Sequence, residues 1–213
     1  MCAASEALYL YAYPDPAHGW KIPTIGCGHT AAAGGLIPVR GMKITLSQAC
    51  AILMQDLNGR YGPRVERAIK RRLMQHVFDG FTSFDLNTGA ILNGTVDDRW
   101  NAGDEAEALD VLRRYVNAGG KRLAGLVTRR ILEARLISDG LYPSAMVLVR
   151  TSPDVPGRMV QASSLPWGSE AGPTMIVAPN TIVPAMPAPM APSTTTTAPR
   201  ASVWTHIQKW WNS

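Results

Sequence analysis

The chain has 213 residues, of which 46% are hydrophobic and 17% charged, and its formal net charge is +5. This balance suits a globular domain with further segments, and the positive charge suits an anionic partner: nucleic acid, a membrane face or an acidic wall polymer. No apolar run reaches the roughly 18 residues of a membrane span, and the first residues lack the basic and apolar regions of a signal peptide.

The first thirty residues are rich in polar and turn-forming side chains. We expect a short helix that carries Glu6, followed by extended segments around LYAYPDP (10–16) and KIPTIGCG (21–28). Prolines and Gly19 punctuate these segments, so a β-hairpin or small sheet is predicted.

From residue 44 the apolar residues recur at helical spacing. The stretch ITLSQACAILMQDL (44–57) opens with Thr45 and Gln48, the pattern of a capping box at a helix start. Further helices, separated by Gly or Asn, are predicted over residues 63–78, 80–88, 104–117 and 123–138. The order predicts an α+β fold in which a small β lobe is followed by a larger α-helical lobe.

Three segments of different composition follow. Residues 143–170 hold two short β-type runs about a Pro/Asp/Gly turn, which we interpret as an extension with a candidate β-hairpin. Residues 171–200 form a Pro/Thr-rich linker, which cannot bury a core. Residues 201–213 form a Trp-rich C-terminal tail. We expect the tail to pack on its own chain or a sister subunit. The alternative is a binding element for a partner protein, a membrane or the cell envelope.

Glu6, Asp15 and Thr24 can converge between the lobes if Glu6 ends a helix and the other two lie on the sheet. A carboxylic acid, a carboxylate and a hydroxyl can together hydrolyse a glycosidic bond. The acid protonates the leaving oxygen, while a group on the other face orients or deprotonates water, or attacks as a nucleophile. The residues alone also allow Asp15 to be a turn residue and Thr24 an ordinary strand residue.

Several motifs resemble those of the phage-type lysozymes of glycoside hydrolase family 24. The order Glu6, Asp15, then TIGCGHT (24–30) is similar to the family signature of Glu, a short β-hairpin with Asp, and Thr-Ile-Gly-x-Gly-His. The segments FTSFDLNTG (81–89) and GLVTRRILEARL (125–136) resemble later family segments. The resemblance implies a two-lobed lysozyme-like catalytic domain over residues 1–142.

The same resemblance implies the reaction and its catalytic residues. Glu6 matches the general acid, Asp15 the carboxylate that positions or activates water, and Thr24 the hydroxyl that helps to hold that water. The implied activity is a muramidase that hydrolyses the β-1,4 bond between N-acetylmuramic acid and N-acetylglucosamine in peptidoglycan, usually with inversion. We expect no cofactor, metal ion or nucleic-acid partner, and no transmembrane segment.

Further residues are expected around the catalytic ones. Candidate substrate-binding residues are Trp20, Gly28, His29 and Asn87, with His29 as a hydrogen-bonding support. The family pairs its catalytic Glu with an Arg of the second lobe, and Arg129 or Arg130 is the candidate. Together with Glu133 these arginines also fit an ordinary charge cluster on a helix surface.

Other functions stay open. A lytic transglycosylase needs only the acid Glu, and this alternative gains if the long turn between Asp15 and Thr24 moves Asp15 away. A non-catalytic virion or wall-binding protein could use the same scaffold. Lacking an export signal, the protein is expected either to stay in the host cytoplasm until a holin releases it to the wall, or to be carried in the virion.

Overall fold

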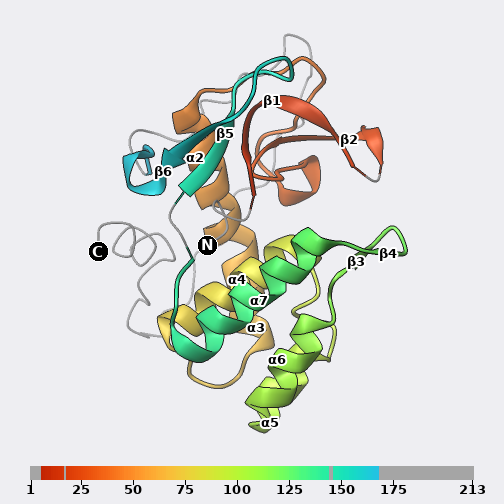
Figure 1. The fold of residues 1–213 in the computed structure, drawn as a ribbon, viewed down its shortest axis with the longest axis vertical. Helices are drawn as coiled ribbons and strands as arrows, with labels where there is room; N and C mark the ends of the chain where they lie inside the picture. Colours follow the sequence, from red (N-terminus) through yellow and green to blue (C-terminus); the bar gives the residue numbers. More distant parts are fainter. Residues whose placement is uncertain (1–5, 17, 144–145, 168–213) are drawn as a thin grey trace, which may run out of the picture.

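The computed structural model describes residues 6–16, 18–143 and 146–167. In Figure 1 a β lobe with one long helix occupies the upper part and a helical lobe the lower part. The predicted linker and tail lie outside the described residues, as does the start of the helix expected around Glu6. Glu6 itself lies in a bend ahead of the first strand, so it is not helical.

The predicted hairpin is confirmed as β1 (Leu8–Asp15) and β2 (Gly19–Gly26), which pair antiparallel. Side chains alternate across a strand, so Leu8 and Ala12 point into the core while Tyr9 and Tyr13 lie on the other face, with ring centroids 4.1 Å apart. At the turn, Gly19 has a φ of +60°, a conformation that favours glycine. The hairpin thereby brings Tyr13 opposite Thr24.

Residues of the C-terminal extension complete this sheet. Strands β5 (Met146–Arg150) and β6 (Arg158–Gln161) form an antiparallel hairpin, and β5 pairs parallel to β1, which gives the order β2-β1-β5-β6. A short 3-10 helix, η3 (Ala162–Ser164), follows. The buried residues of this segment join a core cluster with Leu8 and helix α2 (Leu46–Asp56): Val147, Val149, Ala162, Leu165 and Trp167.

A long helical rod joins the lobes. Helix α2 (Leu46–Asp56) begins with the predicted Thr45–Gln48 capping box, in which both reciprocal hydrogen bonds are present. A π-helical turn, η2 (Leu57–Tyr61), and α3 (Gly62–Ala68) follow without leaving right-handed helical geometry.

The predicted helix over 63–78 is wrong, because α3 ends at Ala68 and the next helix begins at Gln75. The side chain of Asn101 explains the break. Its Nδ2 donates to the Ala68 carbonyl at 2.9 Å, and its Oδ1 accepts from the Lys70 N–H at 2.8 Å. These bonds satisfy backbone groups that another helical turn would otherwise pair.

The helical lobe contains α4 (Gln75–Thr88), α5 (Val96–Ala102), α6 (Glu105–Arg113) and α7 (Ala124–Asp139). No helix was predicted at α5, and the helix predicted over 104–117 ends at Arg113. The chain after α6 instead enters a small hairpin of β3 (Asn117–Ala118) and β4 (Lys121–Arg122), whose turn consists of two glycines with positive φ.

A 3-10 turn, η1 (Ala31–Ala33), lies in the β lobe. Within the described ranges, no helix combines the length and apolarity needed to cross a membrane.

Candidate active site

A cleft of about 410 Å³ lies between the lobes. Its wall brings together Glu6, Asp15 and Thr24, the residues expected to carry the chemistry. They come from the bend before β1, the end of β1, and β2. The other lining residues come from both lobes: Ala7, Tyr9, Tyr13, Pro16, Cys27, Gly28, Thr30, Asp56, Tyr61, Leu86 and Asn87.

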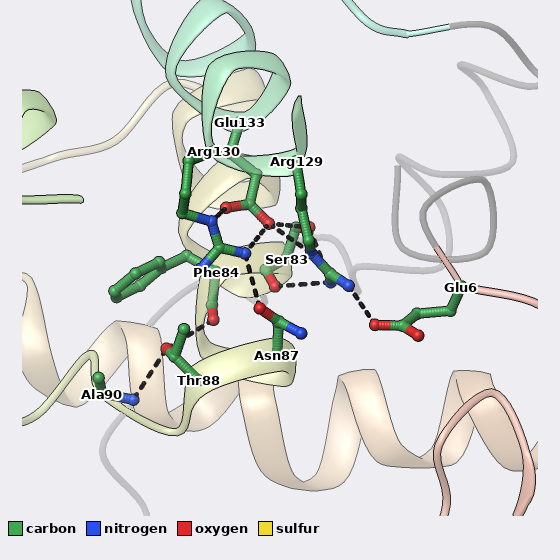
Figure 2. A network of polar contacts seen from close by, with 9 residues as sticks. All are labelled: Glu6, Ser83, Phe84, Asn87, Thr88, Ala90, Arg129, Arg130 and Glu133. Atoms are coloured by element: carbon green, nitrogen blue, oxygen red, sulfur yellow. Dashed lines mark hydrogen bonds and ion pairs between the residues drawn. The ribbon is translucent and has the colours of Figure 1, made fainter. Parts of the chain in front are cut away.

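Glu6 is held from the helical lobe by Arg129 of α7, whose Nη1 donates to Glu6 Oε1 (Figure 2). Arg129 is buried, and its Nε and Nη2 bond to Glu133 Oε1 at 3.0 Å and to the Ser83 carbonyl at 3.2 Å. Of the two arginines considered, Arg129 is therefore the one that meets Glu6.

Arg130 turns to α4 instead. Its Nη2 donates to Asn87 Oδ1 at 2.9 Å, and its Nε lies 2.8 Å from Glu133 Oε2. Asn87 lines the cleft, so Arg130 supports a cleft residue without contacting Glu6 in Figure 2.

The interpretation of Arg129, Arg130 and Glu133 as a surface cluster is wrong, because their exposed fractions are 6%, 0% and 0%. Ser83 Oγ donates to Glu133 at 2.7 Å inside this cluster. Burial raises the pKa of Glu133, and the positive charges of both arginines oppose that shift. With Glu6 included, two carboxyl groups face two guanidinium groups in this network.

Asp15 ends β1 and faces the same cleft as Glu6, so the long turn after it does not remove it from the site. Its Oδ1 accepts from the backbone N–H of His18 at 2.8 Å, and the ring Nδ1 of His18 lies 2.9 Å from the same oxygen. Asp15 therefore also shapes the turn, as the sequence allowed.

Thr24 is buried opposite Tyr13, and its hydroxyl donates to the Ile22 carbonyl at 3.3 Å. Burial raises the pKa of Tyr13 well above its ordinary value, and the nearby Cys27 and Glu6 add to the shift. The Tyr13 hydroxyl accordingly stays protonated at neutral pH and can donate a hydrogen bond within the cleft.

Gly28 lines the cleft with a φ of +77°, whereas His29 lies buried behind the wall. The His29 Nδ1 is 2.8 Å from Asp56 Oδ2, and its Nε2 is 2.7 Å from the Leu36 carbonyl oxygen. A carboxylate and a carbonyl only accept, so this arrangement favours the doubly protonated imidazole, in which both ring nitrogens donate. Burial lowers the pKa of His29, but the bonds to Asp56 and Leu36 outweigh it, and the net shift is upward.

Trp20 is not part of the cleft wall. It lies on β2, half-exposed, with the Arg40 guanidinium 5.1 Å from its ring centroid. Sequence reasoning also missed three residues that support the site: Asp56, Ser83 and Glu133. The positions of Arg129 and Arg130 four and three residues before Glu133 on one helix could have indicated that Glu133 pairs with both arginines.

Across the described ranges, His, Cys, Asp and Glu form no group of three or more suited to a metal ion.

Comparison with known proteins gives this site a family context. The sequence model of the Phage lysozyme family matches residues 3–133. The endolysin of Lactococcus phage c2 is 33% identical over 133 residues, which cover 62% of this chain and 54% of that protein. The chain therefore spans about half the length of that relative.

Two solved structures share the fold. The endolysin from Escherichia coli O157:H7 phage FAHEc1 is 34% identical with a TM-score of 0.56, and the match covers 66% of this chain and 89% of that chain. The muramidase domain of SpmX from Asticaccaulis excentricus is 28% identical with a TM-score of 0.54, over 63% of this chain and 89% of that chain. These similarities confirm the expected α+β fold class.

Proposed function

This chain belongs to the phage lysozyme family, and we propose on that premise that it is a peptidoglycan hydrolase of the muramidase type. The observation that supports the proposal is the cleft into which Glu6, Asp15 and Thr24 face from separate segments. The bond proposed to break is the β-1,4 link between C1 of N-acetylmuramic acid and the oxygen of N-acetylglucosamine.

In the proposed reaction, protonated Glu6 gives its proton to the glycosidic oxygen as the bond to C1 breaks. Thr24 helps to hold a water that attacks C1, and Asp15 accepts the proton that this water loses. The products are a reducing muramic acid end and a free hydroxyl on the glucosamine. Attack from the face opposite the leaving group inverts the configuration at C1.

Arg129 fixes the acid in this scheme. Glu6 lies in a bend, and the strand β1 that follows holds its backbone on the β-lobe side. The ion pair to α7 supplies the second point of attachment and ties Glu6 to the lobe that carries Asn87.

Two other functions use the same scaffold. A lytic transglycosylase also uses an acid Glu but forms a 1,6-anhydro end without water, and the place of Asp15 in the cleft favours hydrolysis over it. A non-catalytic wall-binding or virion protein would need neither carboxyl group in one cleft.

We also propose that the protein opens the wall in phage-mediated lysis or wall penetration, after release through a holin or from a virion. Attachment of residues 201–213 to a phage structural protein or envelope stays a prediction.

The test is mass spectrometry of fragments that the wild-type protein, Glu6→Gln and Asp15→Asn release from purified peptidoglycan. We expect hydrated fragments with muramic acid at the reducing end, and at least a hundredfold slower release by Glu6→Gln, since acid catalysis contributes about 10²–10⁴-fold. The matched control is Glu107→Gln on α6, an exposed Glu that should leave the rate unchanged.

Each other product pattern decides against a part of the proposal. Anhydro ends identify a transglycosylase, and glucosamine at the reducing end identifies cleavage of the other glycosidic bond. A folded wild-type protein that releases nothing is a scaffold. Equal rates for Glu6→Gln and Glu107→Gln remove Glu6 from the role of acid.

A further inference from the structure

His18 is the residue of the β1–β2 turn that reaches back to the catalytic carboxylate. Its ring Nδ1 lies 2.9 Å from Asp15 Oδ1, and its backbone N–H donates to the same oxygen at 2.8 Å. The His18 carbonyl in turn accepts from Lys21 N at 3.4 Å at the start of β2. The turn thus holds His18 by its backbone on the Asp15 side and on the β2 side.

The chemistry of the two groups fixes the direction of the bond. A carboxylate oxygen only accepts, so the His18 Nδ1 must carry a proton whether the ring is neutral or charged. In the neutral ring this selects the Nδ1–H tautomer and leaves Nε2 as an acceptor.

We propose that His18 is a positioning residue for Asp15: its ring and backbone N–H groups fix the rotation of the carboxylate in the cleft wall. That rotation decides the direction from which Asp15 can take a proton from water. The inference rests on the proposed function, because it matters only if Asp15 acts on the attacking water.

The exposure of the pair makes the proposal testable without loss of the fold. The side chain of His18 is 60% exposed and that of Asp15 is 26% exposed, and ion pairs of this kind contribute little to stability. Substitutions of His18 should therefore change the melting temperature little while they change the orientation of Asp15.

The kinetic test compares His18→Ala with His18→Asn on soluble peptidoglycan strands. The Asn side-chain amide can place an N–H near the position of the ring Nδ1, so it keeps the donor and removes the ring. We expect His18→Ala to lower kcat about two- to fivefold with KM unchanged, and His18→Asn to restore most of that loss. Equal rates for all three proteins, or equal losses in both variants, overturn the proposal.

A second readout does not depend on activity. Nitrogen NMR of the neutral His18 ring should show the Nδ1–H tautomer in the wild-type protein and a shift to the Nε2–H tautomer in Asp15→Ala, which removes the acceptor oxygen. An unchanged tautomer between the two proteins overturns the proposal, whatever the reaction. A wild-type protein that cleaves no peptidoglycan but shows the expected tautomer change overturns the proposed function and, with it, the catalytic use of His18, while the pair itself stands.

Discussion

The buried His29–Asp56 pair illustrates how one side chain behind the cleft wall can govern stability. His29 is 2% exposed, and both of its nitrogens donate to acceptors, so the folded state holds the proton more tightly than the unfolded chain does. Deprotonation at high pH leaves one ring nitrogen without a proton opposite an acceptor oxygen.

We expect the pair to stabilise the fold most at low pH. The pKa of His29 is raised, so its contribution is fully present below the ordinary value of about 6.5 and is lost as pH rises through the folded-state pKa. Each pKa unit of elevation corresponds to about 1.4 kcal/mol. Thermal unfolding of the wild-type protein and of His29→Asn between pH 5 and pH 9 measures how much stability the pair contributes at each pH. The difference in stability should shrink as pH rises, and a difference that grows with pH contradicts the assignment.

The sequence indicated the three polar residues of the cleft wall better than the residues that support them. Glu6, Asp15 and Thr24 stand in a local motif, so their spacing was visible, and the structure places them in one cleft. Asp56 could not be found in this way, because its partner His29 is distant in sequence and the π-helical turn that follows Asp56 leaves no periodic signal. The choice of Arg129 over Arg130 required the crossing of α7 over α4, which no spacing on α7 alone reveals.

Among the helices, α4 and α7 pack closely because α4 has a glycine at the contact. An added Cβ at Gly80 would clash with Ile137 Cγ1, because the two carbon atoms would be much closer than van der Waals contact. This contact sets Ser83 and Asn87 of α4 against Arg129 and Arg130 of α7.

Gly80→Ala should therefore lower the free energy of unfolding by about 1–3 kcal/mol, as overpacked helix contacts do. The matched control is Gly59→Ala in η2, where no atom lies within 4 Å of the added Cβ and alanine is the better helix former. Urea titration of both variants measures the difference. Equal stability of the two variants would mean that the α4–α7 contact is looser than described.

The β5–β6 hairpin is a second element whose removal has a defined outcome. We expect a chain that ends at Tyr142 to be unfolded, because it exposes the edge of β1 and loses several buried side chains, each worth about 2–5 kcal/mol. The summed loss is comparable to the whole stability of a typical domain, about 5–15 kcal/mol. A chain that ends at Trp167 keeps every described element and is the control. Circular dichroism shows whether each of the two chains is folded, and a native spectrum for the shorter chain refutes the prediction.

The elements themselves were predictable where local signals exist. The capping box marked the start of α2, and the turn residues marked the β1–β2 hairpin. The pairing of β5 with β1 was not predictable, because parallel partners are chosen by packing over a long stretch of chain. The end of α3 depends on Asn101, which belongs to α5, so the periodic pattern around residue 70 could not show it.

For the molecule as a whole, the net charge of +5 suits an anionic polymer substrate. We expect hydrolysis of anionic cell walls to slow as ionic strength rises from about 0.05 M to about 0.5 M, where the screening length falls well below about 10 Å. Cleavage of short neutral oligosaccharides should change little over the same range. Initial rates on both substrates measure the salt dependence of hydrolysis. Equal salt dependence would mean that long-range electrostatic attraction does not contribute to the rate on cell walls.

The parallel pairing of β1 with β5 also sets the order in which the protein can be finished on the ribosome. The strand after Glu6 emerges first, yet its neighbour in the sheet emerges only after the helical lobe has been synthesised. The intervening helices make local contacts and can form early, whereas closure of the sheet must wait for the distant strand. A nascent chain therefore carries Glu6 and β1 long before the four-stranded sheet beside the cleft can close, and closure must wait for the residues of β5 and β6.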